Sequence, residues 1–245
     1  MRDGRARVPV MAVVLAVLTG CAGGAIVEPP ASRPSATPSP TTDAAATPFP
    51  YSDEPVGVEP GTYRISRSEW SVANFTVTFP QGWTVQYGHV YAKPYSDAVD
   101  EFGFYAVVVD AIYTDACEGA GELMEVGPSV DDLAAALLEQ PGPRASTPVE
   151  TTLGGYPATR IDLTVRKGLD LKTCRLASFG ALGLQVWYSP PADKYFVLEP
   201  DADASAYIVD VEGQRQVFLT QYRSGSSDED VRELHAVLDS IHIET

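Results

Sequence analysis

The chain has 245 residues, with 33 acidic against 17 basic side chains and a formal net charge of −16. Such an acidic chain is disfavoured as a nucleic-acid binder, because phosphate backbones are bound through clustered Lys and Arg. The length gives room for one sizeable domain or, at most, two.

The first twenty residues have the pattern of an export signal. Three Arg at positions 2, 5 and 7 precede an apolar run over 8–18, which is shorter than the roughly 20 residues needed to cross a bilayer. The run ends in Leu18-Thr19-Gly20-Cys21, which resembles a bacterial lipobox. The resemblance implies cleavage before Cys21 and diacylation of its thiol. We therefore expect a signal peptide at 1–20 and a lipid anchor on the extracytoplasmic face of the cell membrane. A plain secretory signal with an incidental Cys is the alternative.

Residues 21–60 are predicted to be a disordered tether. Nine of the chain's twenty Pro lie in this stretch, among Ala, Ser and Thr. A segment of this composition buries too little apolar surface to offset the entropy lost on ordering. The tether would hold a folded domain, expected over 61–245, away from the membrane.

Within 61–245, alternating apolar and polar residues predict many strands. The segment 102–113 is largely apolar in both of its alternating sets, which is typical of a central strand covered on both faces. The other expected strands cover residues 62–65, 75–79, 83–87, 149–153, 158–165, 176–179, 184–188, 195–198, 206–211 and 216–222, with an optional short one over 241–244.

Two helices are predicted. Ser129 precedes Asp131, Asp132 and an apolar stripe that stops at Pro141-Gly142-Pro143, and Ser227 begins a second helix in the same way. Strands, one helix, more strands and one helix indicate the α+β class. The expected fold is an antiparallel β-sheet flanked by two or more α-helices and preceded by a disordered linker.

Three segments, one before the first predicted helix and two after it, resemble those of a known protein family in pattern and order. They are FTVTFPQGW (75–83), LGGYPATRI (153–161) and LDSI (238–241) at the end of the last helix. Together they resemble actinobacterial cell-envelope lipoproteins with a PsbP-like fold. The resemblance implies a binding or accessory role rather than catalysis, and it transfers no functional residue to this chain.

The remaining two cysteines, Cys117 and Cys174, are an even pair in an exported protein, and we expect them to form a disulfide. A redox pair or a metal site is the alternative. The spacing is not C-x-x-C, and no His stands beside either residue.

A weak candidate for a Ca²⁺ site is Asp201, Asp203, Ser205 and Glu212, whose spacing is that of an EF-hand loop. Ala206 stands where that loop needs Gly, and the flanks are predicted strands. A short acidic loop between strands is the simpler interpretation, so no metal and no cofactor is expected.

No catalytic motif stands out. The stretch nearest to a G-x-S-x-G nucleophile elbow, Gly225-Ser226-Ser227, is better explained as a loop before a helix cap. His235 and His242 are too far apart in sequence to share adjacent helical turns as metal ligands.

The expected function is that of a lipid-anchored, non-catalytic binding or accessory module for an envelope protein or a small apolar ligand. One alternative is a carrier for a lipid or another small apolar molecule, with a pocket between sheet and helices. A cell-wall hydrolase is the third. Strand aromatics such as Tyr105 and Trp187 would be core residues, or would line a site if one face of the sheet stays uncovered.

Overall fold

The computed structural model describes residues 46–94, 101–118, 121–174, 182–189 and 194–244. The chain divides into two units, Met1–Asp43 and Ala44–Thr245, and the described residues all lie in the second. The predicted signal peptide, the lipidation site at Cys21 and the expected strand over 176–179 fall outside them. In the described part of the chain, no helix has the length and apolar character needed to span a membrane.

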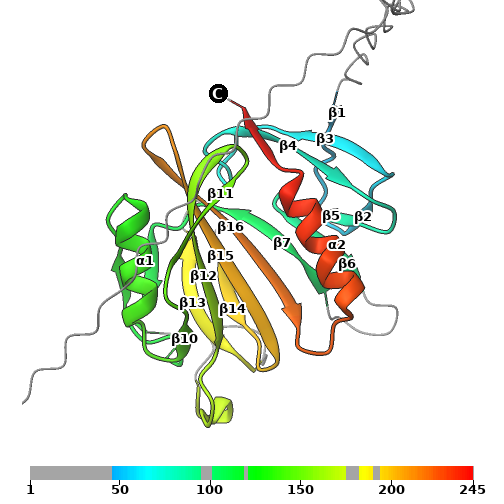
Figure 1. The fold of residues 1–245 in the computed structure, drawn as a ribbon. Helices are drawn as coiled ribbons and strands as arrows, with labels where there is room; N and C mark the ends of the chain where they lie inside the picture. Colours follow the sequence, from blue (N-terminus) through cyan, green and yellow to red (C-terminus); the bar gives the residue numbers. More distant parts are fainter. Residues whose placement is uncertain (1–45, 95–100, 119–120, 175–181, 190–193, 245) are drawn as a thin grey trace, which may run out of the picture. The chain divides into compact units, whose positions relative to one another are not determined.

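A nine-stranded sheet, the central sheet, is the largest element of the second unit (Figure 1). Its strands run in the order β10-β12-β15-β16-β7-β6-β5-β2, with β11 also paired to β12, and all of these pairings are antiparallel. The strands are β2 (Val56–Gly57), β5 (Thr84–Gln86), β6 (Val90–Pro94), β7 (Glu101–Val107), β10 (Pro143–Ala145), β11 (Val149–Leu153), β12 (Tyr156–Val165), β15 (Ala202–Val211) and β16 (Gln214–Arg223).

Two smaller sheets accompany the central sheet. The β4 sheet has the order β1-β3-β4-β17, from β1 (Thr47–Pro48), β3 (Gly61–Ile65), β4 (Asn74–Phe79) and β17 (His242–Glu244). The β13 sheet has the order β14-β13-β8-β9, from β8 (Ala111–Tyr113), β9 (Leu123–Glu125), β13 (Leu184–Ser189) and β14 (Lys194–Leu198).

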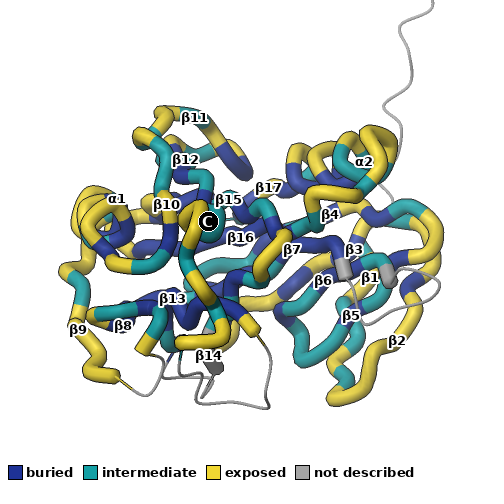
Figure 2. Tube along the Cα trace, turned by 90° about the horizontal axis from the view of Figure 1, so that it is seen from below, coloured by how far each residue is buried: buried dark blue, intermediate teal, exposed yellow. Residues whose placement is uncertain are grey.

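The central sheet is apolar on both faces, because neighbouring side chains along a strand point to opposite sides. Phe104 and Phe218 enter one core, whereas Val107 and Leu219 enter the other. The β4 sheet and helix α2 (Asp228–Asp239) close the first core, and the β13 sheet and helix α1 (Val130–Glu139) close the second. Buried stretches of the central strands therefore lie between more exposed outer elements (Figure 2). Of the strand predicted over 102–113, only the part in β7 is central and covered on both faces in this way.

The predicted α+β class, with one antiparallel sheet flanked by helices, is wrong. Strands make up 48% and helices 14% of the structure, and the described strands form three sheets beside only two α-helices. The helices cover only part of each face, and a second sheet covers the rest. The expected strand over 102–113 in fact divides into β7 in the central sheet and β8 in the β13 sheet. The sequence marks the break by the exposed Asp110, but this residue does not indicate that the second strand joins another sheet.

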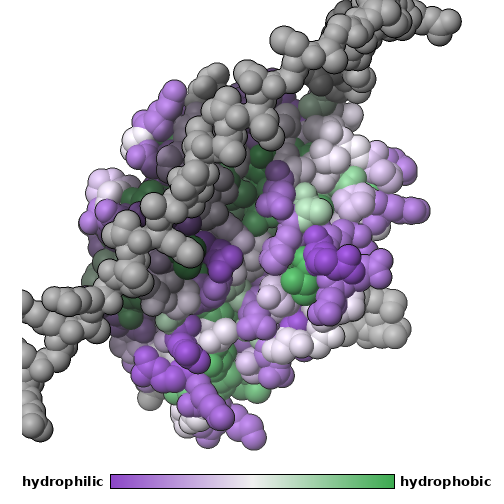
Figure 3. Space-filling view, viewed as in Figure 1, coloured by the Kyte–Doolittle hydropathy of each residue, from purple (hydrophilic) through white to green (hydrophobic). Residues whose placement is uncertain are grey.

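Both helices begin as predicted. The Ser129 hydroxyl accepts a hydrogen bond from the Asp132 amide at 3.1 Å, and the Asp132 carboxylate accepts one from the Ser129 amide at 3.0 Å, forming a capping box. At α2 the Ser227 hydroxyl accepts from the Asp230 amide at 3.1 Å. The outward side of α2 is charged, and hydrophilic side chains gather over this helix on the face shown in Figure 3.

The folded unit begins earlier than the predicted start at Gly61. Strand β1 pairs in parallel with β3, and the Phe49 ring lies 5.7 Å from the Tyr63 ring and 5.2 Å from the Tyr91 ring, centroid to centroid. Its amide also donates to the Arg64 carbonyl at 3.2 Å. Strand pairing and the Phe49 ring therefore place in the fold a stretch that composition alone assigns to the tether.

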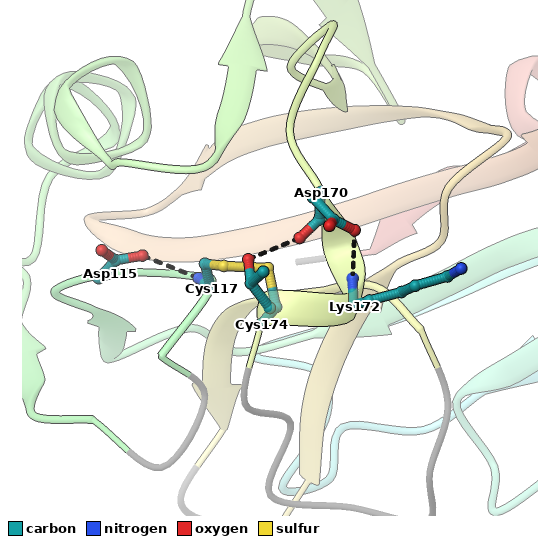
Figure 4. The surroundings of a disulfide bond; sticks show 6 residues. Asp115, Cys117, Asp170, Lys172 and Cys174 are labelled. Atoms are coloured by element: carbon teal, nitrogen blue, oxygen red, sulfur yellow. Dashed lines mark hydrogen bonds between the residues drawn. A yellow bond between two sulfur atoms is a disulfide. The ribbon is translucent and has the colours of Figure 1, made fainter.

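The predicted disulfide joins Cys117, just after β8, to Cys174, just after the short 3₁₀ helix η1 (Leu171–Thr173). Each side has its own backbone support (Figure 4): the Asp115 carboxylate accepts from the Cys117 amide at 2.8 Å, and the Asp170 carboxylate accepts from the Lys172 amide at 3.1 Å. The bond ties the β13 sheet to the segment that follows β12, so the small sheet is linked covalently to the central one.

Replacing both cysteines by serine should lower the free energy of unfolding by about 4 kcal/mol, because the bond closes a loop of 57 residues in the unfolded chain. Urea unfolding of the Cys117→Ser/Cys174→Ser variant measures this, and reduced wild type should behave in the same way. A variant as stable as the oxidised wild type would contradict the prediction.

Gly103 in β7 has no room for a side chain. A Cβ there would overlap the Tyr91 carbonyl oxygen and lie 2.9 Å from the Ala92 Cα, and both atoms belong to the backbone of neighbouring β6. Gly103→Ala should therefore destabilise by about 1–3 kcal/mol. Gly57→Ala is the matched control, because a Cβ on that strand glycine meets nothing within 4 Å. Equal urea midpoints for the two variants would contradict the prediction and show that the β6 backbone moves to accommodate the added methyl group.

Candidate functional site

A half-open pocket of about 280 Å³ lies between the central sheet and the β13 sheet. It is positioned over β16, β7 and β6, whereas α1 packs against β10, β12 and β15 of the same central sheet. The pocket is therefore the part of the second core that the helix leaves uncovered. Its walls are Trp70, Tyr87, His89, Val90, Tyr105, Val107, Trp187, Ser189, Phe196, Val197, Glu199, Leu219 and Gln221.

One wall of the pocket is a stack of two rings. Trp70 and His89 are both buried, and their ring centroids lie 3.4 Å apart with an angle of 11° between the planes. The His89 Nδ1 atom lies 3.1 Å from the Tyr87 carbonyl oxygen, and the Tyr87 ring is stacked 6.1 Å from the imidazole. On the opposite side, the Trp187 and Phe196 rings lie 4.7 Å apart. The walls of the pocket are therefore largely aromatic.

Buried Gln216 holds the loop that carries Trp70. Its amide nitrogen lies within hydrogen-bonding distance of the carbonyl oxygens of Val107 (2.9 Å), Val217 (3.0 Å) and Trp70 (3.3 Å). Its oxygen accepts from the Val72 amide at 2.9 Å. Both ends of this carboxamide are used, so one side chain of β16 fixes the backbone on either side of residue 71.

The polar side chains in the pocket walls differ in whether they already have a hydrogen-bond partner within the protein. The Ser189 hydroxyl donates to the Val108 carbonyl at 2.7 Å, and the Glu199 carboxylate accepts from the Arg223 guanidinium at 3.0 Å. Gln221 is 9% exposed, and its Oε1 is buried without a hydrogen-bond partner among the described residues. Gln221 therefore has unused hydrogen-bonding capacity, and the contacts of Ser189 and Glu199 are structural.

A second polar centre, at Arg215, has a structural role. The buried guanidinium donates to the carbonyl oxygens of Val109, Gly127 and Ser129, the last at 2.9 Å, and so fixes the start of α1 to β16. Burial lowers the pKa of Arg215, and the nearby carboxylates of Asp110 and Asp132 act in the opposite direction. Arginine is effectively always protonated in proteins, so the guanidinium remains a cation, and its three backbone hydrogen bonds serve the fold.

The weak Ca²⁺ candidate does not form a cluster. Asp203 and Ser205 lie within β15, Asp201 is in the turn before it, and Glu212 is in the hairpin turn at its far end. The ten residues of β15 separate Asp201 from Glu212, a distance of about 33 Å at 3.3 Å per residue. The expected acidic loop is in fact mostly strand. No group of three or more acidic, His or Cys side chains in the described part of the chain could hold a metal ion.

The carrier hypothesis predicts a pocket between a sheet and helices, and the observed pocket lies in a different place. It lies between two sheets and not between a sheet and helices, because the β13 sheet was not foreseen as a separate layer. Trp70, His89 and Gln221 were missed as site residues. Only Gln221 has a signal in the sequence. It is a polar residue that follows the apolar Val217 and Leu219 on one face of a predicted strand. The ring stack has no such signal, because its residues lie in two separate loops.

Comparison with known proteins adds little. No protein-family model matches the chain, and no curated protein matches it either. Among solved structures it is similar to the solution structure of cyanobacterial PsbP (CyanoP) from Synechocystis sp. PCC 6803. The identity is 11%, the TM-score is 0.36, and the match covers 77% of this chain and 95% of that one. At this identity and TM-score, the similarity carries no argument about the fold, ligands or activity of this chain.

Gln216→Leu should lower the free energy of unfolding by about 1–3 kcal/mol for each buried backbone group left without a partner, the Val72 amide first. Gln214→Leu is the control on the same strand, because that glutamine is exposed and bonds only to the exposed Arg67 at 3.3 Å. Urea unfolding compares the two variants. Equal losses of stability would mean that Gln216 does not hold the Trp70 loop.

Proposed function

We propose that the chain is a lipid-anchored protein of the cell envelope, and that residues 44–245 form its non-catalytic module for binding a small apolar molecule. The observation that supports this most directly is the half-open, aromatic pocket between the central sheet and the β13 sheet. Small-molecule sites are typically concave and mostly apolar, with a few polar groups that fix orientation.

Three features support the location. The lipobox-like stretch ends at Cys21, and a Pro-rich segment follows it. The Cys117–Cys174 disulfide belongs to an oxidising compartment, as expected outside the cytoplasm. The acidic chain has little electrostatic attraction to anionic lipid, so membrane attachment rests on acyl chains, each CH₂ contributing about 0.8 kcal/mol.

The size of the pocket limits the ligand. A volume of about 280 Å³ is just below the range of about 300–1,000 Å³ that holds drug-sized ligands, so the bound molecule is a small one and not a whole membrane lipid. The open side gives a route for entry and release. Of the ligands considered for a carrier, small apolar molecules therefore fit the pocket volume, and whole lipids do not.

The ionisable groups of the pocket favour binding over catalysis. A general base must reach the proton that it removes from a substrate. The Glu199 carboxylate is paired with Arg223, and the His89 imidazole is stacked on Trp70 with its Nδ1 beside the Tyr87 carbonyl. A protein partner in the envelope stays a prediction, and we do not propose the hydrolase.

Occupancy of the pocket can be tested by native mass spectrometry of the chain from residue 22, exported and purified from the producing organism. We expect an added mass of a small molecule that is lost on denaturation. Val90→Trp should abolish it, because residue 90 lines the pocket and the larger ring fills it. Val149→Trp is the control, since Val149 is exposed on β11.

A bare wild-type mass would contradict the proposal. An added mass that persists in the Val90→Trp variant would contradict the assignment to this pocket.

A further inference from the structure

Gln221 faces the pocket because of the alternation along β16. Val217, Leu219 and Gln221 occupy every second position and point to the second core, where Val217 and Leu219 are packed. Gln221 stands at the end of this set, opposite Gly103 of β7 and Ala204 of β15. Both cross-strand neighbours are small. The carboxamide is therefore held at the edge of the apolar core, among the residues that line the pocket.

The Gln221 oxygen is an acceptor that lacks a donor. A buried polar atom without a hydrogen bond costs about 1–3 kcal/mol, so each such atom needs an explanation. Gln140 also has an unpaired buried oxygen, but its amide nitrogen binds the Tyr113 and Val186 carbonyls at 2.8 and 2.6 Å. Gln140 thus has a structural role, at the end of α1. Within the described residues Gln221 has no comparable bond, and it differs from Gln140 in lining a cavity.

The aromatic walls favour a flat ligand. Trp70 presents a plane that is already stacked on His89, and Phe196 and Tyr105 are only partly buried where they meet the pocket. Aromatic pairs gain about 0.5–1.5 kcal/mol beyond area burial in offset-stacked or edge-to-face arrangements. A planar ring therefore matches these walls better than a flexible alkyl chain, which gains only from burial.

The charges around the pocket favour a neutral ligand. Among the described residues, its lining contains no Lys or Arg, and the one carboxylate there, Glu199, is already paired with Arg223. An anion would lose hydration without gaining a cation, and burying such a charge unpaired is costly. The formal charge of −16 on the whole chain adds to this penalty.

We propose that the pocket selects a neutral, planar aromatic molecule with an N–H or O–H donor, and that Gln221 Oε1 accepts its hydrogen bond. This inference rests on the proposed function and specifies its ligand class. Gln221 is then a specificity-determining residue: the aromatic walls provide affinity, and the carboxamide rejects rings of the same shape that have no donor.

The test compares two probes of matched shape. Indole has an N–H, and benzothiophene has a sulfur atom in its place. Calorimetric titrations use the full-length protein in phosphatidylcholine nanodiscs, with empty nanodiscs as the blank for partitioning. Wild type should bind indole about tenfold more tightly than benzothiophene, a ratio that corresponds to one buried hydrogen bond. Gln221→Leu should remove the difference, and Gln214→Leu, on an exposed position of the same strand, should keep it.

Folding of the variants is checked by urea unfolding. Gln221→Leu should be at least as stable as wild type, because it removes a buried acceptor without a partner. Gln221→Met, closer in shape, replaces it if leucine does not fold. Equal affinity of wild type for both probes, or an unchanged ratio in Gln221→Leu, would overturn the selection by Gln221 and leave the pocket as an unselective apolar site. Binding of neither probe would overturn the ligand class, whereas the mass of a copurified molecule decides the proposed function separately.

Discussion

The structure depends on one constraint: a sheet that is apolar on both faces must be covered on both faces. β7 and β16 send Phe104 and Phe218 to one side and Val107 and Leu219 to the other. Exposing either set to water would cost about 25 cal/mol per Å² of apolar surface. Two short helices cannot cover nine strands twice, so a small sheet completes each core. The three-sheet architecture follows from this need.

The pocket results from how the second face is covered. α1 packs on β10, β12 and β15, and the disulfide fastens the β13 sheet to the segment that follows β12. Towards β7 and β6 the covering becomes incomplete, and rings from two loops stand at the edge of the core. At this edge the polar residues of β16 become important. Gln216 fixes the Trp70 loop, and Gln221 places an unpaired oxygen in the wall.

Features that depend on residues close together in the sequence are predicted well, whereas contacts between residues far apart in the sequence are not. The sequence predicts Ser129 and Ser227 as caps, and the Cys117–Cys174 bond follows from counting the cysteines of a chain that is predicted to be exported. The assignment of β8 to another sheet could not be foreseen, since the register of a strand depends on partners far away in sequence. The pocket brings together residues from 70 to 221, and none of these neighbours is visible in a periodicity. Of its residues, only Gln221 stands out in the sequence, as a polar side chain on an apolar strand face.

Residues 48–60, which the composition assigns to the tether, support the pocket wall without lining it. The Tyr87 amide donates to the Ser52 carbonyl at 2.7 Å, and the Gln86 side chain donates to the Asp53 carbonyl at 2.8 Å. Tyr87 lines the pocket on one side and a second hollow, formed with residues 48–51, on the other. A domain cut at Gly61 would lose these bonds and expose the ring of Tyr91 that Phe49 covers. The wall that holds His89 and Tyr87 therefore depends on the residues that precede Gly61, and the folded unit begins inside the predicted tether.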